Sequence, residues 1–416
     1  MREDQRPTIE LLPLKAALPA GQDSDLTLLV RIHPASAPVG DGRRPPLNLS
    51  FVLDRSGSMD GQPLEMARRA TQVALRLLQP HDRVSIVTFD EQVLTLVAPQ
   101  LATHPEVLCR TVDTITSGGM TALHAGWLEG AMLTAQHLDP AALNRVLLLS
   151  DGEANCGERR PDVIAGHVRG LTARGVGTST IGLGRSYDEA LLQAMADAGD
   201  GNYEHIEDER TLPAFFTAEL QGLTRTTGHT VSLGVEPNPA LGSLRHDVLN
   251  DLPRNSLDRR QLPNLIDGRP LDVVVTLQVP GQALSPSAGV TRVRLAWTDR
   301  QGRRHKVREQ LNLPVVDQEV YARLHDDPRV RLAAEQLRAA RVREEAVAYA
   351  SAGDVGMSRE VLSLERRRLL ASQDPALMAE AEVLHALDRD FADDEVMARK
   401  RAASQSYNVR RSKPQN

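Results

Sequence analysis

The pattern of hydrophobic and polar positions divides the chain into three parts. Between residues 47 and about 224, short apolar runs alternate with longer segments whose apolar residues recur every three or four positions. The short runs are typical of buried strands, and the longer segments are typical of amphipathic helices. Strands that alternate with helices predict a parallel sheet with crossover helices. The strands are expected at 47–53, 83–89, 92–98, 145–150, 177–183 and 203–206.

A strand-only pattern flanks this α/β block on both sides. Two alternating apolar stretches lie within residues 8–38, and strand-like runs return after residue 225 without helical periodicity. Two strands do not make a stable sheet by themselves. We therefore predict that the early strands pair with the late ones, so that the α/β block is inserted into an antiparallel β-sandwich. The Pro- and Gly-rich segment 34–46 is expected to be a linker.

The third part is helical and runs from about residue 317. Its apolar stripes predict three or four short helices up to residue 398. Residues 399–416 are basic and poor in apolar side chains, which predicts a disordered tail. The expected domains are therefore 1–44 (N-terminal strands of the sandwich, with the linker), 45–225 (α/β domain), 226–316 (sandwich), 317–398 (helices) and 399–416 (tail).

Composition narrows the class of protein. The chain has 416 residues, so we expect two or three domains, and its net charge of −6 argues against a protein that binds nucleic acid with its whole surface. The first residues carry charges of both signs and no uninterrupted apolar segment, so we expect no secretory signal there, and the sequence has no run of about 18 apolar residues that could span a membrane. The two cysteines, Cys109 and Cys156, fall in different predicted elements, which argues against a disulfide framework. A cytoplasmic location is expected.

Polar side chains follow two of the predicted strands and precede one helix. A D-x-S-x-S segment comes directly after the first strand, a Thr follows a Gly-Gly pair ahead of a helix, and an Asp ends the most apolar strand. Ligand sites of parallel α/β sheets lie at such strand ends. Carboxylates and hydroxyls are ligands for hard cations of the Mg²⁺ or Mn²⁺ kind. The residues that we predict to form this metal site are Asp54, Ser56, Ser58, Thr121 and Asp151.

With these segments, residues 47 to about 224 resemble a von Willebrand factor type A (VWA) domain that carries a complete metal-ion-dependent adhesion site (MIDAS). The resemblance implies that Ser56 and Ser58 coordinate a cation through their hydroxyls and that Thr121 does so directly or through water. It implies that Asp54 and Asp151 act mostly through waters and orient the other ligands. The implied cation is Mg²⁺, with Mn²⁺ or Ca²⁺ as alternatives. One coordination position would stay open for a Glu or Asp carboxylate of a partner protein.

The overall layout resembles that of bacterial calcium-activated chloride channel-like VWA proteins. The function expected from this resemblance is metal-dependent protein–protein interaction. The alternative is an accessory subunit that recruits substrate to an AAA+ ATPase or chelatase-type complex. Arg55 and Glu153 lie beside the predicted ligands and either tune the choice of acidic partner or point to solvent.

Catalytic motifs are missing from the sequence. There is no H-E-x-x-H zinc motif, no phosphate loop ending in Gly-Lys-Ser/Thr and no G-x-S-x-G elbow, so we expect no enzyme and no catalytic residue. We interpret His124, which lies near Thr121, as a helix-face residue rather than a ligand. The basic tail could bind nucleic acid, an anionic membrane or an acidic partner, but a solvated end is the preferred interpretation.

Overall fold

The computed structural model describes residues 6–36, 45–139, 142–242, 245–255, 257–372 and 374–412. These residues pack as two compact units. One unit is α/β and comprises residues 39–226 with 300–302, and the other contains the rest of the chain. Most of the predicted linker, residues 37–44, lies outside the described residues.

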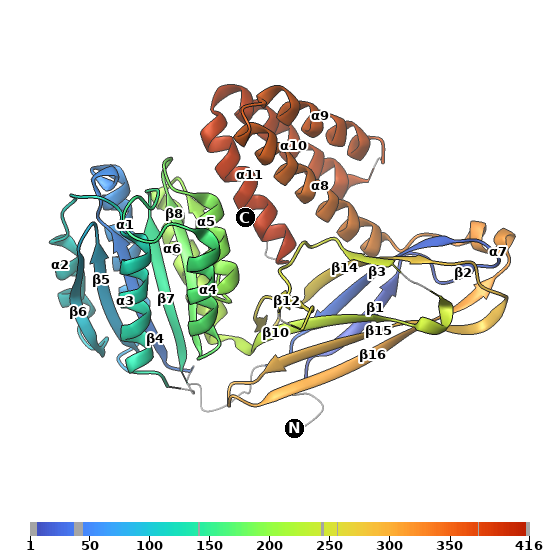
Figure 1. Ribbon diagram of the computed structural model, residues 1–416, viewed down its shortest axis with the longest axis horizontal. Coiled ribbons are helices and arrows are strands. Elements are labelled where there is room, and N and C mark those ends of the chain that lie inside the picture. The colour runs from blue at the N-terminus through green and yellow to red at the C-terminus, as the bar shows by residue number, and fades with distance from the viewer. Residues whose placement is uncertain are drawn as a thin grey trace. The chain divides into compact units, whose positions relative to one another are not determined.

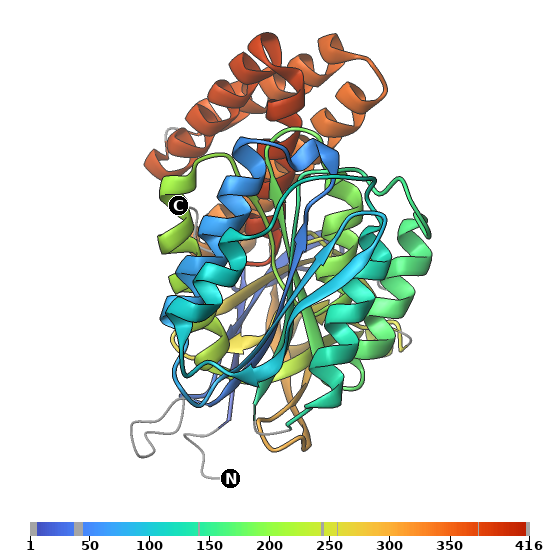
Figure 2. The same ribbon diagram turned by 90° about the vertical axis from the view of Figure 1, so that its left-hand side faces the viewer.

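The α/β unit is built on a six-stranded sheet of order β6-β5-β4-β7-β8-β9 (Figures 1 and 2). All neighbours are parallel except the edge strand β6, which runs antiparallel to β5. The predicted α/β class and all six predicted strands are confirmed. The strands are β4 (Leu47–Asp54), β5 (Arg83–Phe89), β6 (Val93–Leu101), β7 (Leu143–Ser150), β8 (Val176–Leu183) and β9 (Tyr203–Ile206).

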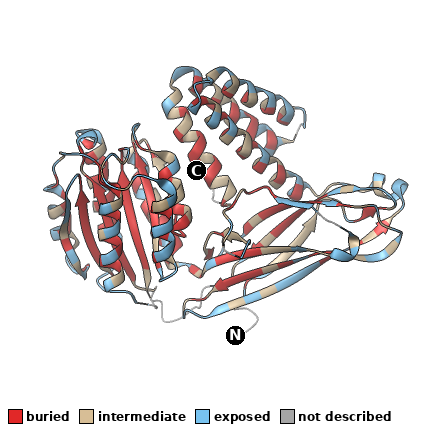
Figure 3. Cartoon of the chain, in the orientation of Figure 1, coloured by how far each residue is buried: buried red, intermediate tan, exposed pale blue. Residues whose placement is uncertain are grey.

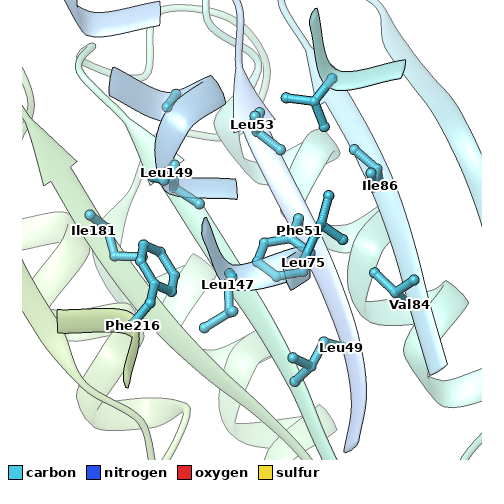
Figure 4. Packing of buried hydrophobic residues seen from close by; sticks show 14 of the residues in the cluster. Leu49, Phe51, Leu53, Leu75, Val84, Ile86, Leu147, Leu149, Ile181 and Phe216 are labelled. Carbon is cyan, nitrogen blue, oxygen red and sulfur yellow. The ribbon is translucent and has the colours of Figure 1, made fainter. Parts of the chain in front are cut away.

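Helices cover both faces of this sheet, which is why its central strands β4 and β7 are buried along nearly their whole length (Figure 3). On one face, the side chains of α1, α2 and α6 share a core with alternate residues of β4 and β7 (Figure 4). On the other face, α3 packs on β4, β5 and β7, and α4 and α5 pack on β8. The helices are α1 (Gln62–Leu77), α2 (Pro105–Asp113), α3 (Leu123–Gln136), α4 (Pro161–Thr172), α5 (Glu189–Ala198) and α6 (Leu212–Thr224).

Two glycines let α3 lie unusually close to the sheet. A Cβ atom on Gly126 would be 2.4 Å from the ring of Phe89, and one on Gly130 would be 2.3 Å from Cγ2 of Val52. Both separations are shorter than van der Waals contact, so only glycine fits at these positions. The close packing fixes the start of α3, and with it the polar segment that precedes the helix.

The second unit contains the predicted β-sandwich. One sheet has the order β1-β3-β14-β11 and the other the order β12-β10-β15-β16-β2, with β13 paired to β10. Strand β3 pairs antiparallel with β14, and Val30 lies opposite Val273, which confirms that the early strands join the late ones. Buried side chains of both sheets form one core. The strands are β1 (Thr8–Pro13), β2 (Leu18–Pro19), β3 (Ser24–His33), β10 (Thr226–Pro237), β11 (Arg245–Val248), β12 (Arg260–Leu262), β13 (Leu265–Ile266), β14 (Leu271–Val279), β15 (Ser285–Thr298) and β16 (Arg304–Val316).

Helices follow the sandwich, as predicted. The first turns of α8 pack on the outer face of the β3–β14 sheet, and α8 to α11 bury a common core of Leu and Ala side chains. An Asp side chain caps the N-terminus of each of these four helices. Among the described residues, no helix combines the length and the apolar character that crossing a bilayer requires. The helices are α7 (Gln318–Arg323), α8 (Pro328–Ser351), α9 (Val355–Leu370), α10 (Pro375–Asp393) and α11 (Glu395–Arg410).

The prediction of a disordered tail from residue 399 is wrong, because this segment forms most of α11. Lys400 is 1% exposed, Tyr407 is fully buried, and Ser406 Oγ donates a hydrogen bond to the carbonyl of Ala340 at 3.1 Å. The buried face of α11 consists of small and amphipathic side chains packed against α8 and α10. These residue types carry almost no hydrophobic signal, so the sequence pattern missed the helix. Residues 413–416 lie outside the described residues.

Candidate metal centre

The polar segments predicted to hold a metal meet at the C-terminal edge of the α/β sheet. Asp54 is the last residue of β4, and Asp151 follows the last residue of β7. These strands are parallel neighbours, with Leu53 opposite Leu149. Their register therefore brings the two aspartates side by side. Thr121 lies two residues ahead of α3, which packs on both strands.

Hydrogen bonds join the D-x-S-x-S segment to Asp151. Ser58 Oγ donates to Asp151 Oδ1 at 2.9 Å and lies 3.2 Å from Ser56 Oγ. The backbone N–H of Ser56 donates to Asp54 Oδ1 at 2.8 Å, which closes the turn after β4. Four of the five predicted residues are thus linked directly.

The position of Gly152 shows that Thr121 belongs to the same cluster. A Cβ atom built on Gly152 would lie 3.1 Å from Ser58 Oγ, 3.2 Å from Thr121 Oγ1 and 3.6 Å from Asp54 Oδ2. Oxygen atoms from separate segments therefore surround one small volume that only a glycine leaves free. We call Asp54, Ser56, Ser58, Thr121 and Asp151 the five-residue site.

Backbone hydrogen bonds hold the three segments in register. The N–H of Gly57 donates to the carbonyl of Gly119 at 2.9 Å, and the N–H of Gly118 donates to the carbonyl of Arg55 at 2.8 Å. The N–H of Thr121 donates to Asn155 Oδ1 at 2.7 Å. Because these bonds cross between segments, the hydroxyls are positioned before any ligand binds.

The side chain of Arg55 forms an ion pair with a neighbouring acidic residue. Its Nη2 lies 2.7 Å from Oδ2 of the buried Asp90, whose carbonyl also accepts a hydrogen bond from the N–H of Ala122. The positive charge of Arg55 is therefore neutralised locally. Glu153, by contrast, is exposed.

The five-residue site is buried on one side and open on the other. Asp54 is fully buried and Asp151 is 3% exposed, whereas Ser58 is exposed. Burial raises the pKa of Asp54, against hydrogen bonds from Ser150 and Ser56. Burial also raises the pKa of Asp151 to about 6, with a further contribution from the charge of Asp54 and opposition from Ser58. Both shifts reflect negative charge held away from water without a positive group.

Sequence reasoning missed several residues that support the site. Ser150 Oγ donates to Asp54 Oδ2 at 2.6 Å, Gly152 leaves the central volume free, and Asn155 holds the backbone of Thr121. The first two flank Asp151 in the sequence, so the S-D-G triplet at the end of β7 was an available signal. No sequence motif identifies Asp90, which supports the site through its ion pair with Arg55 and its backbone hydrogen bond with Ala122.

The set of atoms fits a hard divalent cation. All donors are carboxylate or hydroxyl oxygens, the kind that Mg²⁺ prefers. Over the described residues, no Lys, Arg or His forms an ion pair with Asp54 or Asp151, so their charge lacks an internal partner. The same part of the chain holds no group of three or more His, Cys, Asp and Glu residues suited to a metal. Any metal at the five-residue site would therefore depend on the Ser and Thr hydroxyls.

Comparison with known proteins identifies the α/β unit. Residues 48–218 match the family model of the von Willebrand factor type A domain, so the chain contains a VWA domain. Among curated proteins, it is 28% identical over 198 residues to the uncharacterized protein YfbK of Escherichia coli (strain K12). It is 31% identical over 199 residues to human inter-alpha-trypsin inhibitor heavy chain H3. These alignments cover 47% and 46% of the chain but only 34% and 22% of the two relatives.

Two solved structures resemble the whole chain in fold. A von Willebrand factor type A protein from Catenulispora acidiphila aligns with a TM-score of 0.71 over 100% of this chain and 99% of its own, at 17% identity. The ArnB paralog VWA2 from Sulfolobus acidocaldarius aligns with a TM-score of 0.62, over 97% and 98% of the two chains, also at 17% identity. The combination of VWA domain, antiparallel sheets and C-terminal helices therefore recurs in solved structures.

Proposed function

We propose that this protein is a metal-dependent protein–protein interaction module whose five-residue site is a complete MIDAS. The observation that carries the proposal is the ring of Ser58, Thr121 and Asp54 oxygens around the volume next to Gly152. Ser56 and Ser58 would hold Mg²⁺ through their hydroxyls, joined by Thr121. Asp54 and Asp151 would act through water and orient the hydroxyls. The bound cation supplies a coordination position for a carboxylate oxygen of a partner.

The residues of the site favour an acidic partner. The three hydroxyl ligands are neutral and the two carboxylates would act through water, so no charged oxygen of the chain would bind the cation directly. An incoming Glu or Asp side chain would supply the one charged ligand and complete the coordination shell. The exposed Ser58 marks the open side. The proposal assigns no catalytic step to the chain.

The first experiment measures the metal itself. Mn²⁺ binding is followed by electron paramagnetic resonance for the full chain and for Asp151→Asn. We expect one Mn²⁺ per chain, displaced by Mg²⁺, and loss of binding by at least about tenfold in the variant, a change of about 1.4 kcal/mol. The matched control is Glu153→Gln, which removes an exposed carboxylate two residues away and should bind as the parent does. Equal binding by the parent and Asp151→Asn would contradict the proposal.

The second experiment tests the open position. Water-proton relaxation reports the waters on bound Mn²⁺, so a carboxylate that replaces a water lowers the relaxation enhancement. We expect this decrease with a Glu-containing peptide and none with the same peptide carrying Gln. If neither peptide changes the relaxation while Mn²⁺ is bound, the site holds a cation but does not receive a carboxylate.

A further inference from the structure

Two histidines outside the five-residue site face each other across neighbouring helices. His124 lies in the first turn of α3 and His167 in the middle of α4, on the same face of the α/β sheet (Figure 1). Nε2 of His124 is 3.0 Å from Nδ1 of His167. Their ring centroids are 5.0 Å apart and the rings are tilted by 36°. At this distance the two rings form an N–H···N hydrogen bond, in which one ring supplies the proton and the other accepts it.

A metal ion that takes the place of the hydrogen-bonded proton would bind both rings. With metal–nitrogen bonds of about 2.0 Å, nitrogens 3.0 Å apart subtend an angle of about 97° at a shared ion, which suits neighbouring ligands of one metal. Imidazole is a ligand for Ni²⁺, Cu²⁺ and Zn²⁺, and the affinity of a nitrogen site for divalent ions rises through Ni²⁺ to Cu²⁺.

The surroundings also suit a cation. His167 is exposed, so its ring can turn to aim its lone pair at an ion. His124 is half-buried, so its ring stays fixed. Burial and then the neighbouring His167 ring lower the pKa of His124, which keeps the imidazole in its neutral, ligating form at neutral pH. The Glu158 carboxylate, which forms an ion pair with Arg160, acts on the pKa of His124 in the opposite direction.

We propose that Nε2 of His124 and Nδ1 of His167 are neighbouring ligands of a second metal site, which binds a transition-metal ion of the Cu²⁺ or Ni²⁺ kind. Its other coordination positions are open to water or to a donor from outside the chain. This site shares no residue with the five-residue site and differs from it in chemistry, because imidazole prefers softer cations than hydroxyl oxygens do.

A buried tryptophan provides the first test. Trp127 lies one helical turn from His124, with 6.0 Å between ring centroids, and it is fully buried. In a Trp297→Phe protein without a histidine tag, Trp127 is the sole tryptophan of the chain. With Mg²⁺ saturating, Ni²⁺ is titrated while Trp127 fluorescence is recorded. We expect quenching that saturates at one equivalent, and an affinity at least tenfold lower for His167→Gln.

Two controls make the result decisive. His137→Gln removes an exposed histidine of the same unit, and Asp151→Asn removes a member of the five-residue site; both should quench as the parent does. Equal quenching by the parent and His167→Gln would overturn the proposal, as would loss of quenching in Asp151→Asn. Cu²⁺ electron paramagnetic resonance on Cys156→Ser then counts ligands. Coupling to two imidazole nitrogens supports the site, and coupling to fewer contradicts it.

Discussion

Two buried polar clusters in the α/β unit differ in how they balance charge. Toward the start of β7 and β8, Arg145 and Glu219 are joined through Ser179: Arg145 Nη1 donates to Ser179 Oγ at 3.0 Å, and Ser179 Oγ donates to Glu219 Oε1 at 2.8 Å. The side chain of Asn202 donates to the other oxygen of Glu219 at 2.5 Å. We call these four residues the closed cluster. At the C-terminal end of the strands, the five-residue site has two carboxylates and no positive side chain.

This difference in charge balance shows which cluster is complete without a ligand. In the closed cluster a chain of hydrogen bonds through Ser179 joins a guanidinium to a carboxylate, and an amide donates to the other carboxylate oxygen, so its polar groups stabilise the fold without a ligand. In the five-residue site, hydroxyl groups donate hydrogen bonds to Asp54 and Asp151 but do not neutralise their charge. We infer that the first cluster serves stability and the second serves binding. Mutations in the two clusters should therefore differ in their effects on stability and on metal binding.

Breaking the closed cluster should have the largest effect on stability. Glu219→Ala removes the buried carboxylate that accepts hydrogen bonds from Ser179 and Asn202, and it breaks the chain of hydrogen bonds that leads to the buried Arg145. We expect a loss of about 3–5 kcal/mol in the free energy of unfolding, because two hydrogen bonds to a charged group are lost. Urea unfolding is followed by Trp127 fluorescence in the Trp297→Phe background, which reports on this unit. The loss should be the same in Mg²⁺ and in EDTA; a loss that appears in only one would contradict the separation of roles.

The corresponding change in the five-residue site should not lower the stability of the metal-free protein. Asp151→Asn removes a buried charge but keeps an oxygen that can accept from Ser58. In EDTA we expect an unfolding free energy equal to or above that of the parent. In Mg²⁺ at a hundred times the parent's dissociation constant, the parent should gain about 2.7 kcal/mol, and the variant, which binds at least about tenfold more weakly, no more than about 1.4 kcal/mol. The same urea titrations measure both values, and a clear loss of stability in EDTA would make Asp151 a structural residue.

A smaller change tests the central volume. Gly152→Ala would place a methyl group 3.1 Å from Ser58 Oγ and 3.2 Å from Thr121 Oγ1, where we propose the cation binds. We expect Mn²⁺ affinity to fall about tenfold, or 1.4 kcal/mol, by isothermal titration calorimetry. Gly166→Ala is the control, because a Cβ atom there meets nothing within 4 Å and should leave affinity unchanged. Unaltered Mn²⁺ binding by Gly152→Ala would place the cation elsewhere.

How far the sequence predicts this contrast depends on how each residue is positioned. Asp54, Ser56, Ser58, Thr121 and Asp151 were identifiable because each lies in a compact segment beside a strong strand or helix signal. The closed cluster was not, since Arg145, Ser179, Asn202 and Glu219 are far apart in sequence and meet only through the fold. The helix α11 was missed for a related reason: its buried face is made of small residues, and only packing against α8 and α10 reveals it. The likeness of the layout to calcium-activated chloride channel-like proteins stays a prediction.

The pH dependence of the metal-free protein gives the most delicate test of the comparison. The pKa of Asp151 is raised to about 6 in the folded protein, above its usual value of about 3.9 in an unfolded chain. A protonated Asp151 therefore stabilises the fold below about pH 4, and this contribution is lost as the pH rises through 6. Urea unfolding in EDTA between pH 4 and 7 should show this decline for the parent and a weaker one for Asp151→Asn. Saturating Mg²⁺ should offset the decline in the parent, because the cation replaces the proton as the partner of the carboxylate. If the two proteins lost stability in parallel, the charge of Asp151 would already be balanced within the chain, and the five-residue site would be as complete as the closed cluster.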